Sequence, residues 1–280
     1  MREISVKVIT DAIAQMCIEA NHELSSDMTG KIEEAYNNET SDIGKKILGQ
    51  LLDNLTIAKE DMIPICQDTG MAVIFLQVGQ DVHLIDGDLT EAVNEGVRIG
   101  YTEGYLRKSV VGDPIERINT KDNTPAVIHT QIVPGENVSI TVAPKGFGSE
   151  NMSRVFMLKP AEGIEGVKEA ILTAVKDAGP NACPPMAVGV GIGGTFEKCA
   201  LMAKQALTRE VGERSDIPYV AELENEMIDK LNSLNIGPGG LGGRTTVLNV
   251  AINTYPTHIA GLPVAVNICC HVNRHVTRVI

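Results

Sequence analysis

The sequence has no tryptophan and few other aromatic residues, with four phenylalanines and five tyrosines among 280 residues. This scarcity argues against the stacking of nucleobases on aromatic side chains as a mode of binding. The chain also lacks an excess of positive charge, because its formal net charge is −12 at pH 7. Such a surface does not neutralise phosphates, so we expect no nucleic-acid partner. An anionic ligand would have to meet a local cluster of arginine or lysine.

Long apolar runs are missing as well. No stretch approaches the run of about 18 apolar residues that a membrane span needs, so we expect no membrane association. The first 20 residues contain Glu3 and Asp11 and have the pattern of an amphipathic helix, not that of a signal peptide. Six cysteines are present, but a chain of this length does not need disulfides. Without an export signal we expect reduced thiols and a cytoplasmic location.

The apolar periodicity predicts a mixture of helices and strands. Residues 1 to about 60 have helical spacing, with Ser41 as the expected N-cap of the second apolar stripe. A hairpin is predicted over 126–143, with its turn at 134–137. Helices and strands follow one another irregularly, which indicates an α/β or α+β fold with mixed sheets flanked by helices, in one domain over residues 1–280. Further strands are predicted at 72–78, 186–192, 245–252 and 262–268, further helices at 164–175, around Cys199 and at 220–234, and glycine-rich loops at 145–151 and 236–243.

Three cysteines stand far apart in the sequence, each where a loop or a strand end is expected: Cys66, Cys183 and Cys270. Cys66 opens a polar turn, and Cys183 is followed by two prolines, which keep a thiolate in a loop and recur after cluster cysteines. Three thiolates can hold three irons of a four-iron cluster and leave the fourth iron open as a Lewis acid. If these three cysteines converge, the sequence predicts a catalytic iron–sulfur site.

The remaining cysteines favour other roles. Cys269 and Cys270 are adjacent at the end of a predicted strand, so their side chains should face opposite sides, and one would ligate while the other packs. Cys17 and Cys199 lie on apolar helical faces and are predicted core residues. Structural zinc is a poorer interpretation, because zinc ligands usually come in close pairs. A thiol nucleophile with a histidine base stays open, although none of the six histidines stands in a motif that marks it as that base.

Two further features concern anion binding. The glycine-rich loop 145–151 could receive an anion on its backbone N–H groups, although no Lys-Ser/Thr pair closes it as in a P-loop. The alternative is a simple exit loop after the hairpin. Arg107 is by default a surface residue, and it becomes significant only for an anionic substrate, because the guanidinium fork matches a carboxylate.

Four segments carry these features: Cys66-Gln67-Asp68-Thr69-Gly70, residues 145–151, Ala182-Cys183-Pro184-Pro185 and Cys270-x-x-x-Arg274. Together they resemble the iron–sulfur (class I) fumarate hydratases. The resemblance covers nearly the whole chain and is closest to the α subunit of the two-subunit type, which L-tartrate dehydratase shares. It implies reversible hydration of fumarate to malate, a step of the tricarboxylic acid cycle, with L-tartrate dehydration as the alternative. An iron–sulfur sensor is the alternative from another class.

The same resemblance implies an oxygen-sensitive 4Fe-4S cluster held by Cys66, Cys183 and a third cysteine near the C-terminus. We assign Cys270 over Cys269 as that third ligand, because Cys270 stands four residues before Arg274, as in the terminal segment of the family.

The resemblance also implies a dicarboxylate site that this chain completes only in part. Substrate contacts map onto Gln67, Asp68, Arg107 and Gly148, and Asp68 would also transfer the proton at the leaving oxygen. One-chain members of the family carry a second domain that supplies further arginines, a lysine and a catalytic threonine. We therefore expect these groups to come from a separate β subunit, in an α2β2-type hetero-oligomer or with an α homodimer.

Overall fold

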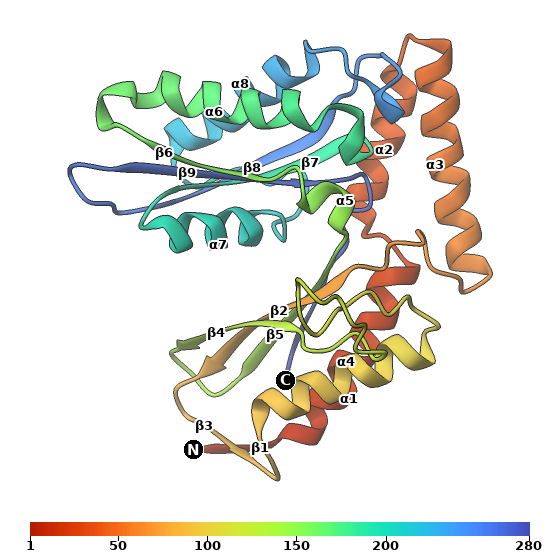
Figure 1. The fold of residues 1–280 in the computed structure, drawn as a ribbon, viewed down its shortest axis with the longest axis vertical. Coiled ribbons are helices and arrows are strands. Elements are labelled where there is room, and N and C mark those ends of the chain that lie inside the picture. Colours follow the sequence, from red (N-terminus) through yellow and green to blue (C-terminus); the bar gives the residue numbers. More distant parts are fainter. The chain divides into compact units, whose positions relative to one another are not determined.

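The computed structural model describes all 280 residues, and its contacts divide the chain into two compact units (Figure 1). The first unit consists of Met1–Leu24, Leu55–Phe147 and Arg274–Ile280. The second unit consists of Ser25–Asn54 and Gly148–Asn273. The prediction of one domain over residues 1–280 is not tested by this division, which concerns contacts and not independent folding. No helix has both the length and the apolar content that a membrane span requires.

The first unit contains a four-stranded sheet with two helices on one face. Its elements are β1 (Arg2–Ser5), α1 (Val6–His22), β2 (Met71–Gly79), β3 (Val82–Ile85), α4 (Leu89–Glu103), β4 (Val127–Val133), β5 (Val138–Lys145) and β10 (Val276–Val279). The strand order is β10-β5-β2-β4, and β1 pairs with β3 in a separate parallel ribbon. Alternate residues of β5, such as Ile140 and Val142, are fully buried against Ile13 of α1 and Val97 of α4. The period-2 pattern of the strand therefore meets the apolar stripes of the helices in one core.

The second unit is a sheet with helices on both faces. Its elements are α2 (Ser26–Asn38), α3 (Asp42–Glu60, whose last residues from Leu55 belong to the first unit), α5 (Phe147–Glu150, whose first residue belongs to the first unit), β6 (Arg154–Leu158), α6 (Gly163–Ala178), β7 (Met186–Gly193), α7 (Phe196–Ala206), α8 (Pro218–Asn232), β8 (Val247–Tyr255) and β9 (Leu262–Cys269). The strand order is β6-β9-β7-β8. Figure 1 shows α6 and α8 on one face of this sheet and α7 on the other. Single-turn 3₁₀ helices lie at Pro160–Glu162, Gly179–Ala182 and Pro238–Gly240.

Most of the predicted elements are confirmed, and the fold is of the α+β type with mixed sheets. Ser41 caps α3 as expected, because its hydroxyl accepts a hydrogen bond from the Gly44 N–H at 3.2 Å. The strands around 72–78, 186–192, 245–252 and 262–268 correspond to β2, β7, β8 and β9, and the helices at 164–175, around Cys199 and at 220–234 correspond to α6, α7 and α8.

The predicted hairpin over 126–143 is wrong. Both of its strands exist, but β2 lies between them, parallel to β4 and antiparallel to β5. The connection 134–137 crosses the end of β2, where the Gly79 N–H donates to the Asn137 carbonyl at 2.9 Å. The reason lies in β2, whose consecutive residues Ala72, Val73 and Ile74 are all buried. A strand that is buried along one face and also at Val73 on the other favours a central position in the sheet over an edge.

Two smaller expectations also differ from the structure. The N-terminal region is helical only from Val6, because Arg2–Ser5 form β1. The glycine-rich loop 145–151 contains the short helix α5. A further strand that was not predicted, β10, follows Cys270 and pairs antiparallel with β5. β1 and β10 are four-residue strands whose partners are distant in the sequence, so local pattern does not reveal them.

Replacement of Gly191 by alanine is expected to destabilise the protein. Gly191 lies within β7, where an added Cβ would stand 2.1 Å from the carbonyl oxygen of Cys199 in α7. The strand and the helix would have to move apart, which typically costs about 1–3 kcal/mol. Gly30→Ala is the control, because Gly30 lies in α2 with nothing within 4 Å of an added Cβ. Thermal unfolding should show a lower midpoint for the Gly191 variant and an unchanged or higher midpoint for the control; equal midpoints would contradict this packing.

Candidate active site

Residues 66–70, which we call the 66–70 loop, form an irregular segment that leads into β2. Cys66 and Asp68 are half-buried and Gln67 is exposed, whereas Thr69 and Gly70 are buried. Gly70 has a φ of +76°, and an added Cβ would stand 2.6 Å from the main-chain carbon at position 145. Glycine is therefore required for the loop to turn into the sheet beside β5.

The three successive carbonyl oxygens of residues 68–70 accept hydrogen bonds from buried side chains. The donors are, in order, the guanidinium of Arg274, the hydroxyl of Tyr101 at 2.8 Å and the amide of Asn123 at 3.2 Å. Their exposed fractions are 4%, 0% and 0%. Burial raises the pKa of the Tyr101 hydroxyl above its usual range, so this group keeps its proton and remains a donor. The loop is thus held in one conformation by donors from three distant segments.

The carboxylate of Asp68 is oriented by the main chain. Its Oδ1 accepts from the Gly70 N–H at 3.1 Å, and its Oδ2 accepts from the Phe147 N–H at 2.9 Å. Asp68 also donates its own N–H toward the sulfur of Cys66 at 3.5 Å. Each carboxylate oxygen keeps a further lone pair, so Asp68 can still bind or accept a proton while its position is fixed.

Arg107 is exposed and lies in the irregular segment 104–126 between α4 and β4. Thr69 holds its main chain on both sides: the Thr69 hydroxyl accepts from the Arg107 N–H at 2.9 Å and donates to the Arg107 carbonyl at 3.3 Å. Long irregular segments of this kind usually carry function. We predicted no role for Thr69 from the sequence, because its partner is 38 residues away.

In the second unit, Cys183 and Cys270 belong to adjacent segments. β7 and β9 are antiparallel with Ala187 opposite Cys269, so the residues before β7 lie next to those after β9. The Nδ1 atom of His271 lies 3.0 Å from the carbonyl oxygen of Cys183. Cys183 is exposed with a φ of +52°, and Cys270 is half-buried.

The other three cysteines are core residues. Cys269 is 4% exposed and packs against Ala187 and Leu207, whereas Cys270 is only half-buried. Cys17 and Cys199 are fully buried, which confirms the core prediction for both. Burial raises the pKa of the Cys17 thiol to about 12.

Each unit contains part of the predicted site. The first unit holds Cys66, Gln67, Asp68 and Arg107, and the second holds Cys183, Cys270 and Gly148. Neither unit contains a group of three or more His, Cys, Asp or Glu side chains that could hold a metal ion. The convergence of the three cysteines therefore stays a prediction.

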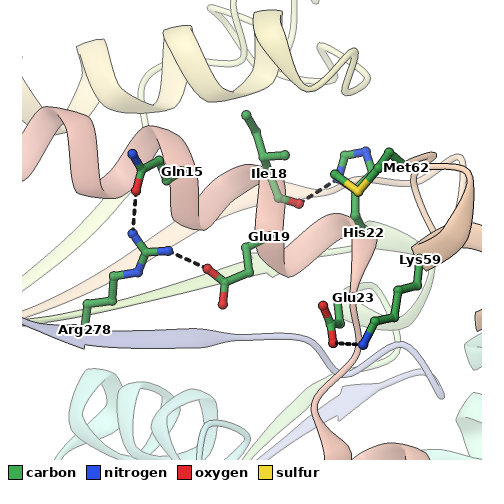
Figure 2. A pocket seen from close by; sticks show the side chains of 8 residues that line it. All are labelled: Gln15, Ile18, Glu19, His22, Glu23, Lys59, Met62 and Arg278. Atoms are coloured by element: carbon green, nitrogen blue, oxygen red, sulfur yellow. Dashed lines mark hydrogen bonds and ion pairs between the residues drawn. The ribbon is translucent and has the colours of Figure 1, made fainter.

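A cavity of about 310 Å³ in the first unit contains none of the predicted site residues (Figure 2). Its cations already have partners: Arg278 pairs with Glu19 and also donates to the Gln15 amide oxygen, and Lys59 pairs with Glu23. A dicarboxylate entering this cavity would have to displace an existing carboxylate. The cavity therefore offers no unpaired arginine or lysine to a dicarboxylate.

The sequence is similar to known proteins along nearly its whole length. Residues 10–279 match the family model for fumarate hydratase (Fumerase). A Methanocaldococcus jannaschii protein, assigned provisionally as the α subunit of L(+)-tartrate dehydratase, is 40% identical over 95% of each chain. The L(+)-tartrate dehydratase α subunits of Escherichia coli strains UTI89 and K12 are each 32% identical, over 99% of this chain and 92% of their own length.

These matches confirm the resemblance derived from the motifs. The chain belongs to the fumarate hydratase family, and it is a hydro-lyase.

Thr69→Val is expected to loosen the segment around Arg107 while leaving the size of the buried side chain unchanged. Loss of a buried hydrogen-bond partner costs about 1–3 kcal/mol, so the thermal midpoint should fall. Hydrogen exchange at the Arg107 amide should become faster, because its acceptor is gone. Thr69→Ser keeps the hydroxyl and is the control. Unchanged exchange at Arg107 in the valine variant would show that Thr69 does not hold this segment.

Proposed function

We propose that this chain is the α subunit of a two-subunit cytoplasmic hydro-lyase that hydrates fumarate reversibly to malate, with a 4Fe-4S cluster held by Cys66, Cys183 and Cys270. The family supports hydro-lyase chemistry. The relatives that are named as α subunits support a separate β subunit. The observation that carries the proposal is the 66–70 loop. This one segment contains the thiol of Cys66 and the carboxylate of Asp68, and its Thr69 hydroxyl binds the main chain of Arg107.

The donor set fits such a cluster. The three assigned cysteines are exposed or half-buried and stand in irregular segments, whereas the three remaining cysteines are packed in the core. None of the six forms a disulfide. Arg274, which stands four residues after Cys270, donates to the carbonyl of Asp68.

The chemistry requires a proton to leave a carbon next to a carboxylate and hydroxide to leave its neighbour. When bound, the cluster would supply an open iron that acts as a Lewis acid on the leaving hydroxyl. The residues of this chain would bind and orient the substrate. Arg107 would hold a substrate carboxylate through its guanidinium, Asp68 would give or take the proton at the leaving oxygen, and the main-chain N–H of Gly148 would donate to the substrate, with Gln67 as a further contact.

The β subunit would complete the site on the other side of the substrate. Further cationic groups and the group that acts on the carbon-bound proton are assigned to it, in an α2β2-type hetero-oligomer or with an α homodimer. This division explains why the chain offers only Arg107 as an exposed cation among the assigned contacts.

L-tartrate dehydration is the second candidate, and the names of the relatives favour it. The two substrates are both dicarboxylates, and the groups that would tell them apart are hydroxyls. Assays of the reconstituted enzyme with fumarate, malate and L-tartrate decide between them. An iron–sulfur sensor is disfavoured by the net charge of −12, which gives little room for a nucleic-acid surface.

Asp68→Asn is expected to lower turnover by about 100-fold or more, since general acid–base catalysis contributes about 10²–10⁴-fold. The measurement is the hydration rate of the anaerobically reconstituted variant with its β subunit, together with its iron content, which should equal that of the unaltered protein. Asp113→Asn is the matched control, because the carboxylate of Asp113 also accepts backbone N–H groups, from Ile115 and Glu116, but stands outside the site. Full activity of the Asp68 variant would refute this role.

A further inference from the structure

Arg274 is a buried cation without a counter-charge. It is 4% exposed, and its only hydrogen bond runs from Nη2 to the Asp68 carbonyl. Its Nε and Nη1 atoms are buried and have no partner. The other arginine with a buried unpartnered nitrogen, Arg209, differs because it pairs with the fully buried carboxylate of Glu224.

The guanidinium of Arg274 forms no ion pair with an acidic group. The carboxylate of Asp68 is held by the N–H groups of Gly70 and Phe147 and forms no ion pair with Arg274. Burial raises the pKa of Tyr101, and the positive charge of Arg274 lowers it. Because Tyr101 contacts the 66–70 loop, the charge of Arg274 affects groups beside this loop. An unpaired charge away from water is costly, and removing it is often neutral or stabilising. Its presence therefore suggests an anion that joins only when the site is loaded.

We propose that Arg274 is the counter-charge of the anionic iron–sulfur centre that Cys66 would ligate, and that through its bond to the Asp68 carbonyl it positions the 66–70 loop. The inference rests on the proposed function, because the anion exists only when metal is bound. A cysteine binds metal as its thiolate, so loading the site places an anionic centre two residues from the Asp68 carbonyl. Arg274 then gains the partner that it lacks in the unloaded protein.

Two variants separate the charge of Arg274 from its hydrogen bond. Arg274→Gln keeps an N–H donor for the Asp68 carbonyl but has no charge, and Arg274→Lys keeps the charge. Before metal loading, the glutamine variant should unfold at the same temperature as the unaltered chain or higher. After anaerobic reconstitution it should lose its cluster about 10- to 100-fold faster, the usual effect of removing a group that supports metal ligands. Its reduction potential should also fall, because a nearby positive charge favours the more negative, reduced cluster. The lysine variant should stay close to the unaltered protein.

Arg278→Gln is the matched control. It also removes a cation near the C-terminus, but Arg278 already has partners, Gln15 and Glu19. It should change neither the lifetime nor the potential of the cluster. Binding of succinate, a dicarboxylate that cannot be hydrated, is measured by calorimetry on the loaded proteins.

Three results overturn this inference. A glutamine variant that is less stable than the unaltered chain before loading would make Arg274 a structural residue. Unchanged cluster lifetime and potential would remove its electrostatic role. Weaker succinate binding with an unchanged cluster would make it a substrate ligand instead. Failure of the unaltered chain to take up iron is a different outcome, since it refutes the proposed function itself.

Discussion

The site depends on a constraint placed on the carbonyl groups of the 66–70 loop. Three buried donors, Arg274, Tyr101 and Asn123, each satisfy one of three successive carbonyl oxygens. These donors come from the C-terminal segment, from α4 and from the segment before β4, so the loop takes its shape only when all three are folded. The three donors thereby fix the main chain that carries a thiol and a carboxylate, and main-chain N–H groups orient the carboxylate itself. Such support from surrounding residues is what precise chemistry requires of a loop.

Local pattern was sufficient for most of the elements and for the candidate residues. A few residues of chain are enough to recognise the apolar stripes of α1 and α3 and the alternation of apolar residues in β5. The same holds for the loop-forming residues next to Cys66 and Cys183. Partners distant in the sequence cannot be recognised in this way. Strand pairing depends on which strand gains most from burial, and a short window of sequence does not show the competing strands. This applies to the place of β2 between β4 and β5, to the ribbon of β1 with β3 and to the pairing of β10 with β5.

The same limit applies within the site. Cys66, Asp68 and Arg107 could be proposed because their residue types and motifs carry chemistry. The partners of Thr69 and Arg274 lie 38 and 206 residues away. The terminal motif already contained Arg274, but only the fold reveals what Thr69 and Arg274 contact. The structure also shows that the Arg274 guanidinium is buried and that two of its nitrogens have no hydrogen-bond partner, which the sequence cannot show. Departures from the usual rule that buried charges are paired are expected at functional sites.

The central claim is that three cysteines distant in the sequence bind one cluster. The most direct test is the iron content and visible absorbance of the anaerobically reconstituted chain in a series of single cysteine-to-alanine variants. The account predicts about four irons in the unaltered chain. It also predicts loss of the cluster with Cys66→Ala, Cys183→Ala or Cys270→Ala, and retention with Cys269→Ala. A full cluster in the Cys66 variant, or its loss only with Cys269→Ala, would contradict the claim.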